Sequence, residues 1–209
     1  MRWFQILCLV ACLAVPWCPA RANDWSEAVD GDLSDDGDVP TLLTFTPGSN
    51  FIQGTMGSLG GTGPLDPDVW RFTVATGYYL TAIDLTEYSA PTSGNQSFMA
   101  IAQGDSINMT DPSQHLSNGL WGKEVDGFGN TYTNLLAILD AGPEYGGYGF
   151  DGPLPAGDYT FWIQEGAEQI TYGINFVTTP VPEPGSACLL GVAALLLMRR
   201  RRAHVRGTS

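Results

Sequence analysis

Glycine and proline interrupt residues 23–180 at such short intervals that no segment sustains a 3.6-residue apolar repeat over ten or more positions. Short runs of alternating apolar and polar residues fill this region instead, with turn-forming residues between them. The pattern predicts an all-β domain, an antiparallel β-sandwich or jelly roll over residues 41–180.

Aromatic and aliphatic side chains alternate with polar ones in three of the expected strands, which predicts one core-facing side in each. Residues 103–134 and 140–157 are rich in Gly, Asn, Asp and Ser and are expected to be long loops. Residues 135–139 are apolar throughout and fit either a buried strand or one helical turn. The expected strands are 41–45, 50–55, 68–74, 80–86, 98–102, 158–164 and 171–177, and the expected inward residues are Trp70, Phe72, Val74, Tyr159, Phe161, Ile163, Tyr172, Ile174 and Phe176.

The charge of this region is strongly one-sided. Residues 23–180 hold 21 Asp and Glu side chains against only Arg71 and Lys123, a net charge of −19. Because nucleic-acid binding requires cations that neutralise phosphates, an unaided nucleic-acid partner is excluded. Docking of the domain itself on anionic lipid is disfavoured for the same reason.

Residues 1–22 have the order of a secretory signal peptide. Arg2 precedes an apolar run over residues 3–15, and Ala20-Arg21-Ala22 provides an A-x-A cleavage site for signal peptidase. The alternative is an uncleaved anchor helix, for which the run is short. The cysteines lie at positions 8, 12, 18 and 188, so the region between 23 and 180 has no disulfide framework and no thiol nucleophile.

The C-terminus combines three features in a fixed order. Pro182-Glu183-Pro184 comes first, an apolar run over residues 187–198 follows, and four arginines occupy 199–202. A helix over residues 185–198 would reach only about 21 Å, which is short for a hydrocarbon core of about 30 Å. The arginines should stay cytoplasmic, so this tail is expected to be a short transmembrane helix with the domain outside.

Residues 181–202 resemble the PEP-CTERM sorting signal of bacterial exported proteins. The resemblance implies recognition by an exosortase, removal of the tail near the motif, and delivery to the cell surface or the exopolysaccharide matrix. Val181, Pro182, Glu183 and Pro184 would then be substrate residues of the sorting enzyme, within a signal that we assign to residues 181–209. Gly185 stands where serine is commoner in that signal, and a plain C-terminal anchor is the alternative.

The domain resembles the bacterial pre-peptidase C-terminal β-sandwich. The resemblance rests on Asn23-Asp24, on the Asp-Pro-Asp-Val-Trp-Arg-Phe-Thr-Val stretch at 66–74, on Gly77 with 80–85, and on Leu-Pro-Ala-Gly-Asp-Tyr-Thr-Phe at 154–161 with Tyr172. It implies a non-catalytic accessory module, and some members of that family bind calcium or polymeric ligands. The peptidase that often accompanies such modules is absent here.

An acidic entry segment at 23–40 is the candidate calcium site. Counted from Asp32, side-chain oxygens of Asp32, Ser34, Asp36 and Asp38 fall at loop positions 1, 3, 5 and 7, a spacing that suits Ca²⁺. Leu43 stands where an EF-hand has its glutamate, so the segment is not an EF-hand. Asp30 adjoins the loop, and the family resemblance adds Asp24. The alternative is a solvated acidic linker.

Trp162 and Gln164 point away from the inward set of their strand. An aromatic ring beside an amide on an exposed face would suit stacking against a sugar of an extracellular polysaccharide. The competing interpretation is that a long loop covers this face and buries Trp162.

No enzyme motif accompanies these features. There is no G-x-S-x-G elbow, no H-E-x-x-H and no phosphate-binding glycine loop, and we expect His115 to be a solvent-exposed loop residue. We therefore expect a non-catalytic exported protein with a structural or adhesive role, in contact with a membrane only through its tail. The alternatives are a calcium-dependent carbohydrate-binding module and a secreted hydrolase.

Overall fold

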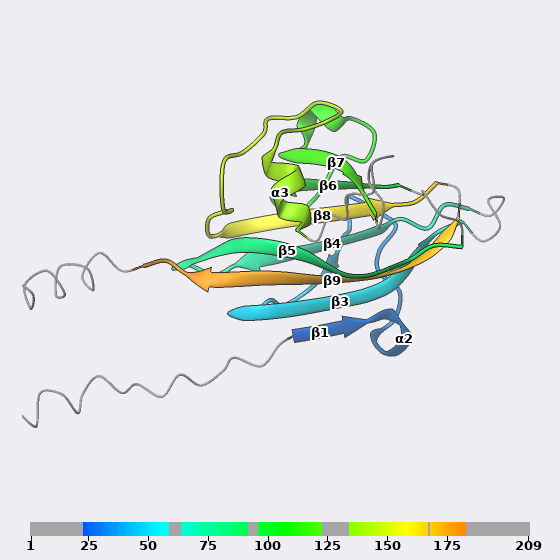
Figure 1. Ribbon diagram of the computed structural model, residues 1–209, viewed down its shortest axis with the longest axis horizontal. Coiled ribbons are helices and arrows are strands. Elements are labelled where there is room, and N and C mark those ends of the chain that lie inside the picture. The colour runs from blue at the N-terminus through cyan, green and yellow to red at the C-terminus, as the bar shows by residue number, and fades with distance from the viewer. Residues whose placement is uncertain (1–22, 59–63, 92–95, 123–133, 167, 183–209) are drawn as a thin grey trace, which may run out of the picture.

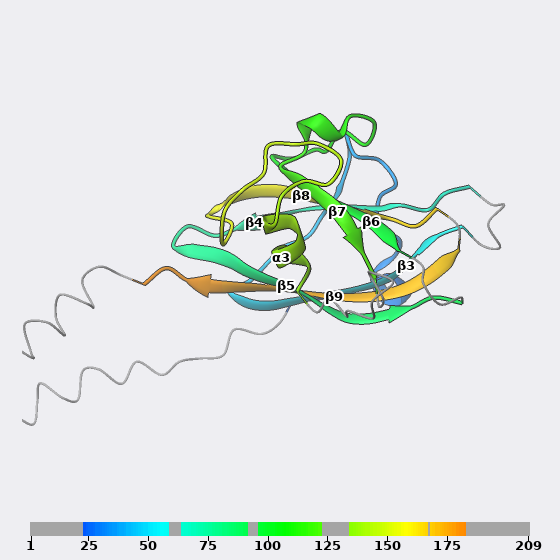
Figure 2. The same ribbon diagram turned by 45° about the horizontal axis from the view of Figure 1, so that its top comes forward.

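The computed structural model describes residues 23–58, 64–91, 96–122, 134–166 and 168–182, and two β-sheets in a sandwich-like arrangement dominate them (Figures 1 and 2). One sheet has the order β1-β3-β9-β5 and the other the order β2-β4-β8-β6-β7. The strands are β1 (Asn23–Ser26), β2 (Thr41–Leu42), β3 (Gly48–Gly57), β4 (Asp68–Val74), β5 (Tyr78–Ser89), β6 (Ser97–Gln103), β7 (Ser117–Trp121), β8 (Gly157–Gln164) and β9 (Gln169–Pro180). Three short helices accompany them: α2 (Glu27–Asp30), the 3₁₀ turn η3 (Pro112–Gln114) and α3 (Leu135–Asp140).

Aromatic side chains from both sheets form the core between the layers. The ring centroids of Phe161 in β8 and Phe176 in β9 lie 5.3 Å apart and join the two sheets. Trp70 in β4 packs on Phe161 at 5.1 Å. All nine residues expected to face inward are at most 2% exposed and belong to one cluster, which confirms the alternation in these strands. Burial of each such side chain stabilises the fold by about 1.5–3 kcal/mol.

The central strand pairs are antiparallel, as expected, but both edge pairs at the start of the chain are parallel. β1 runs parallel to β3 and β2 runs parallel to β4. A parallel pair needs a crossover connection, and residues 27–47 and 43–67 provide the two connections. Because β1 has four residues and β2 has two, neither is long enough to show a diagnostic alternation.

The structure corrects the prediction for one segment between residues 103 and 140, and it decides between two alternatives for another. β7 lies inside the stretch expected to be loop, since its Ser-Asn-Gly-Leu-Trp sequence lacks a regular apolar period. It pairs antiparallel with β6 and buries Trp121 fully. Residues 135–139 belong to helix α3, whose first turn is capped by Asn134, because the Asn134 side chain accepts a hydrogen bond from the Leu136 amide.

The described part of the chain contains no helix that is long and apolar enough to cross a membrane. The expected signal peptide at 1–22, the apolar run at 187–198, Glu183 and Pro184 lie outside the described residues. The last strand, β9, ends at Pro180, and the next amide, that of Val181, donates to the Gly77 carbonyl at 2.8 Å. The folded sheet therefore ends immediately before the Pro-Glu-Pro motif.

Candidate metal centre

Asp68 is a carboxylate on the inward side of a core strand. It is the first residue of β4, and Trp70 and Phe72 follow it at two-residue intervals. Because alternate residues of a strand point to the same side, the Asp68 side chain lies between the sheets with them. Asp68 is 0% exposed, and neither carboxylate oxygen has a hydrogen-bond partner among the described residues. A buried, unpaired carboxylate is costly in its charged form. Burial, reinforced by the charge of Glu27, raises the pKa of Asp68 to about 9.

Glu27, the first residue of α2, approaches the same point from the entry segment. Its Oε2 accepts a hydrogen bond from the Thr55 amide at 2.7 Å, which fixes the side chain against β3. Its Oε1 is buried and has no partner in the described structure. Burial raises the pKa of Glu27, and the Thr55 hydrogen bond opposes part of that rise. One carboxylate oxygen of Glu27 is therefore held by the sheet and the other is free to bind a ligand.

Gly54 makes the approach of Glu27 possible. A Cβ atom at position 54 would lie 2.4 Å from Cδ of Glu27, well inside van der Waals contact. No other residue type lacks this atom, so the seat of Glu27 on β3 requires glycine.

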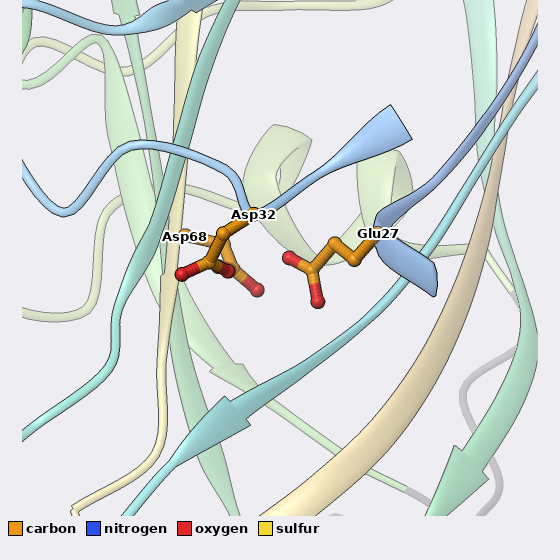
Figure 3. Close-up of side chains that lie close together, drawn as sticks. All are labelled: Glu27, Asp32 and Asp68. Atoms are coloured by element: carbon orange, nitrogen blue, oxygen red, sulfur yellow. The ribbon is translucent and has the colours of Figure 1, made fainter. Parts of the chain in front are cut away.

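Asp32 completes a group of three carboxylates with Glu27 and Asp68. One ligand oxygen from each lies within 4.8 Å of the others, and the side chains point toward one another from three separate segments (Figure 3). Asp32 is exposed, Glu27 is half-buried and Asp68 is fully buried. The group therefore runs from the surface to the interior.

A second group shares Asp32. Asp32, Asp35 and Asp66 also hold oxygens within 4.8 Å of one another. Partial burial and the charges of Asp32, Asp35 and Glu27 raise the pKa of Asp66 to about 6. Burial and the charge of Asp32 raise the pKa of Asp35. Five carboxylates thus lie close together, and the one ion pair found among the described residues, between Arg71 and Asp105, involves none of them.

The chemistry of these donors suits a hard divalent cation. All five side chains offer carboxylate oxygen, the ligand that Ca²⁺ prefers. Two oxygens bound to one Ca²⁺ at about 2.4 Å lie at most about 4.8 Å apart, which the spacing within each group satisfies. An open hollow of about 480 Å³, with Glu27, Asp32 and Gly54 in its wall, connects the first group to solvent.

The residues expected from the sequence to bind calcium are only partly brought together. Of Asp24, Asp30, Asp32, Ser34, Asp36 and Asp38, Asp32 alone belongs to either carboxylate group. The others make local turns: Asp30 accepts from the Ser26 amide, the Ser34 hydroxyl from the Asp36 amide, and Asp36 from the Asp38 amide. Asp24 is exposed on β1. The acidic run thus folds on itself and directs Asp32 toward β4.

Glu27, Asp35, Asp66 and Asp68 were missed as candidate ligands. One signal for Asp68 was present in the sequence, because the alternation of 68–74 that turns Trp70 and Phe72 inward also turns Asp68 inward. A charged residue at an inward position needs a partner. Glu27 carried no comparable signal, since only the parallel pairing of β1 with β3 brings it to Thr55.

Trp162 does not form an exposed aromatic platform. It is 6% exposed and packs in a second apolar cluster with Val69, Ala100 and Ile107. Its ring lies 4.7 Å from that of Phe98 and 5.9 Å from that of His115. This placement agrees with the interpretation in which a long loop covers Trp162, and it argues against the sugar-stacking face at Trp162 and Gln164, because loop residues cover the indole. Gln164 is half-buried and pairs with Phe98 across β8 and β6.

The expectation for His115 was wrong: it is 0% exposed. Its Nε2 lies 2.7 Å from the Asn108 carbonyl and its Nδ1 lies 3.3 Å from the Asn118 amide nitrogen. Since an amide nitrogen donates and a carbonyl accepts, Nε2 carries the proton in this arrangement. His115 therefore joins the loop 104–116 to β7 and is a structural residue.

Comparisons with known proteins add no assignment. No family model matches the chain, and a search of curated proteins finds no match.

Proposed function

We propose that this chain is a non-catalytic β-sandwich module whose carboxylate centre binds calcium. The observation that carries the proposal is Asp68, a fully buried carboxylate with no partner for either oxygen, placed against Glu27 and Asp32. A bound cation would supply the missing partner to Asp68 and to Oε1 of Glu27. Without a cation, the same end of the sandwich must hold protons on these groups or tolerate their repulsion.

Calcium fits better than the other common divalent ions. Zinc favours histidine and cysteine, and neither residue type belongs to either group. Magnesium demands near-ideal octahedral geometry and keeps several waters, whereas calcium accepts many oxygens in irregular arrangements. Five carboxylates of differing burial suit the more adaptable ion.

The role that we assign to the cation is structural. Glu27, Asp32 and Asp35 belong to the segment before β2, while Asp66 lies two residues before β4 and Asp68 is its first residue. A cation shared between them would fasten the entry segment to the five-stranded sheet. This bond would stabilise a domain that has no cysteine between residues 23 and 180.

We also propose that the module is exported and sorted through residues 181–209. The support is the order of Pro182-Glu183-Pro184, apolar run and arginines, together with the end of the sheet at Pro180. A folded domain that ends just before the motif leaves the motif accessible to a membrane-bound exosortase. The expected destination is the cell surface or the extracellular polysaccharide matrix, with a structural or adhesive role.

The calcium proposal is tested by thermal unfolding of the exported protein in EDTA and in Ca²⁺. At a calcium concentration 100-fold above Kd, stabilisation is about 2.7 kcal/mol, which corresponds to a Tm increase of roughly 5–10 °C. Asp68→Asn and Asp32→Asn should abolish this increase, whereas Asp36→Asn, which alters an exposed acid outside both groups, should retain it.

The Asp68→Asn variant also carries its own folding control. Since it removes a buried carboxyl without a partner, its Tm in EDTA should equal or exceed that of the wild type. An equal calcium response in wild type and Asp68→Asn would refute this site, and a response lost only in Asp36→Asn would move the site to the acidic run. Absence of any calcium response in the wild type would refute the proposal itself.

A further inference from the structure

The first and last strands of the domain meet at one end of the four-stranded sheet. β1 starts at Asn23, which pairs with Asn50 of β3, and Asn50 pairs in turn with Phe176 of β9. β1 runs away from this end, whereas β9 runs toward it and ends at Pro180 (Figure 1). Only β3 separates the two strands, and neighbouring strands lie about 4.8 Å apart, so Asn23 and Phe176 are about 10 Å apart.

Three segments form the surface at this end, which we call the chain-end surface: residues 46–49, 75–79 and 177–182. Strand pairing joins the first two segments to β9, and the Val181 amide donates to the Gly77 carbonyl at 2.8 Å. None of these residues is Asp, Glu, Lys or Arg. The chain-end surface is therefore uncharged, although the region from 23 to 180 has a net charge of −19.

The other sheet does carry charge at this end. Asp158, near the start of β8, accepts a hydrogen bond from the Thr73 hydroxyl at 2.6 Å. Arg71 and Asp105 form the ion pair at 3.9 Å. A partner that disfavours net negative charge would therefore contact the end of the four-stranded sheet and not the whole end of the sandwich.

Two tyrosines begin β5 within the chain-end surface. Tyr78 and Tyr79 are half-buried, and Thr76 and Gly77 before them are exposed. Tyrosine is enriched at membrane–water interfaces, because its ring is apolar and its hydroxyl group is polar. Aromatic and small uncharged residues together suit the lipid–water interface of a zwitterionic membrane, where the acidity of the remaining domain meets no anionic lipid.

The length of chain beyond β9 keeps this surface near a membrane that the tail spans. The apolar run begins at residue 187, six residues after Val181, and six extended residues span at most about 20 Å. The headgroup layer occupies about 5–8 Å of that length. The chain-end surface would then lie no more than about 15 Å from the headgroups. Before signal cleavage, the apolar run over residues 3–15 would tether Asn23 at the same end.

We propose that the chain-end surface rests on the lipid–water interface before the tail is processed, with the carboxylate centre pointing away from the bilayer. This inference rests on the proposed sorting through residues 181–209, and it adds a contact of the folded domain to that of the tail. Glu27 is seated on Thr55, seven residues along β3 from Gly48. This separation is about 23 Å along the strand, which directs the carboxylate centre toward the exterior.

The test uses the signal-cleaved protein that keeps its tail, purified from a strain without the exosortase and reconstituted into phosphatidylcholine vesicles with nitroxide-labelled headgroups. Cys188→Ala removes the one native thiol of this form, and a fluorophore is attached through Ala75→Cys or Gly166→Cys. Both positions are exposed, and Gly166 lies between β8 and β9 at the opposite end. We expect at least twofold quenching of the probe at position 75 and none at position 166.

A matched pair of charge variants tests the lipid contact itself. Thr76→Asp places a carboxylate on the chain-end surface and should lower the quenching at position 75, because a charge resists transfer out of water. Its Tm should not change, since Thr76 is exposed. Gly166→Asp adds the same charge at the opposite end, where a Cβ meets nothing within 4 Å, and should leave the quenching as it is.

The outcomes separate this inference from the proposals before it. Protein that floats with the vesicles but is quenched equally at both positions, or more at position 166, would overturn this inference alone. Unchanged quenching in Thr76→Asp would do the same. Because the vesicles hold no other protein, a surface that contacts the sorting enzyme instead of lipid would give no quenching and would also overturn it.

Protein that does not float with the vesicles would overturn the membrane-spanning tail, and this inference with it. A tail that is kept on surface protein in the wild-type strain would refute the sorting proposal but leave a measured orientation standing. The measurement uses no calcium, so failure of the calcium proposal does not affect it.

Discussion

Asp68 and Tyr172 face each other from opposite sheets of the sandwich, and both are 0% exposed. Neither the Asp68 carboxyl nor the Tyr172 hydroxyl makes a hydrogen bond of ordinary geometry with any described residue. The hydroxyl is near enough to lower the pKa of Asp68 in part, but burial and Glu27 outweigh it. Burial and the charge of Asp68 raise the pKa of Tyr172 in turn. Without a hydrogen-bond partner, the buried Asp68 carboxylate must be neutralised by a bound proton or by a cation.

The first prediction concerns stability against pH in the absence of calcium. The pKa of Asp68 rises from 3.8 to about 9 on folding, so between these values the folded state holds a proton that the unfolded state has lost. The free energy of unfolding should therefore fall as pH rises through this window, by at most about 1.4 kcal/mol per pH unit. Asp66, with a pKa of about 6, adds to the fall between about pH 4 and 6.

Urea unfolding in EDTA at pH 5 and pH 8 measures this slope. Asp68→Asn should flatten it, and saturating Ca²⁺ should oppose it, because the cation replaces the proton and binds more tightly at high pH. A wild-type protein that becomes more stable from pH 5 to pH 8 in EDTA would contradict the assignment of a protonated Asp68.

The second prediction concerns Gly54. In Gly54→Ala the new Cβ would lie 2.4 Å from Cδ of Glu27 and must displace that carboxylate. We expect calcium affinity, measured by isothermal titration calorimetry, to fall at least tenfold, about 1.4 kcal/mol. Gly166→Ala, where a Cβ meets nothing within 4 Å, is the control and should keep the wild-type affinity. Unchanged affinity in Gly54→Ala would exclude Glu27 as a ligand.

The third prediction separates burial from ligand binding at Trp162. Because the indole is 6% exposed and packed on Phe98, Trp162→Ala should lower the free energy of unfolding by about 3–5 kcal/mol. Gln164→Ala, at a half-buried position near the end of the same strand, should change it by less than about 1 kcal/mol. Chemical denaturation measures the free energy of unfolding of both variants. A Trp162→Ala protein as stable as the wild type would show that the ring is exposed in solution.

The fourth prediction concerns processing of the tail. Intact-mass analysis of protein released from the cell surface should show a chain that ends near Pro182-Glu183-Pro184 and lacks the apolar run. Deletion of the exosortase, or Glu183→Ala in the chain, should leave a longer, membrane-associated form. If surface protein keeps the apolar run in the wild-type strain, the tail is an anchor and the sorting proposal fails.

Much of the sandwich follows from local pattern. The alternation in 68–74, 158–164 and 171–177 is set by the two-residue period of a strand, so the inward residues could be identified without coordinates. β1 and β7 could not be identified in this way. β1 is a strand because it pairs with β3, and β7 because it pairs with β6, and pairing partners distant in the chain leave no local signature.

The sequence by itself predicted an all-β module, and it established that residues 23–180 are acidic and free of cysteine. It also predicted a calcium site in the entry segment, but that prediction grouped residues that are neighbours in the chain. Only the tertiary structure decided that Asp32 meets Glu27 and Asp68 rather than Asp36 and Asp38. The physical reason is that β1 pairs with β3 in one sheet and β2 pairs with β4 in the other, so residues 27–40 pass from one sheet to the other and proximity there depends on strand pairing rather than on spacing along the chain.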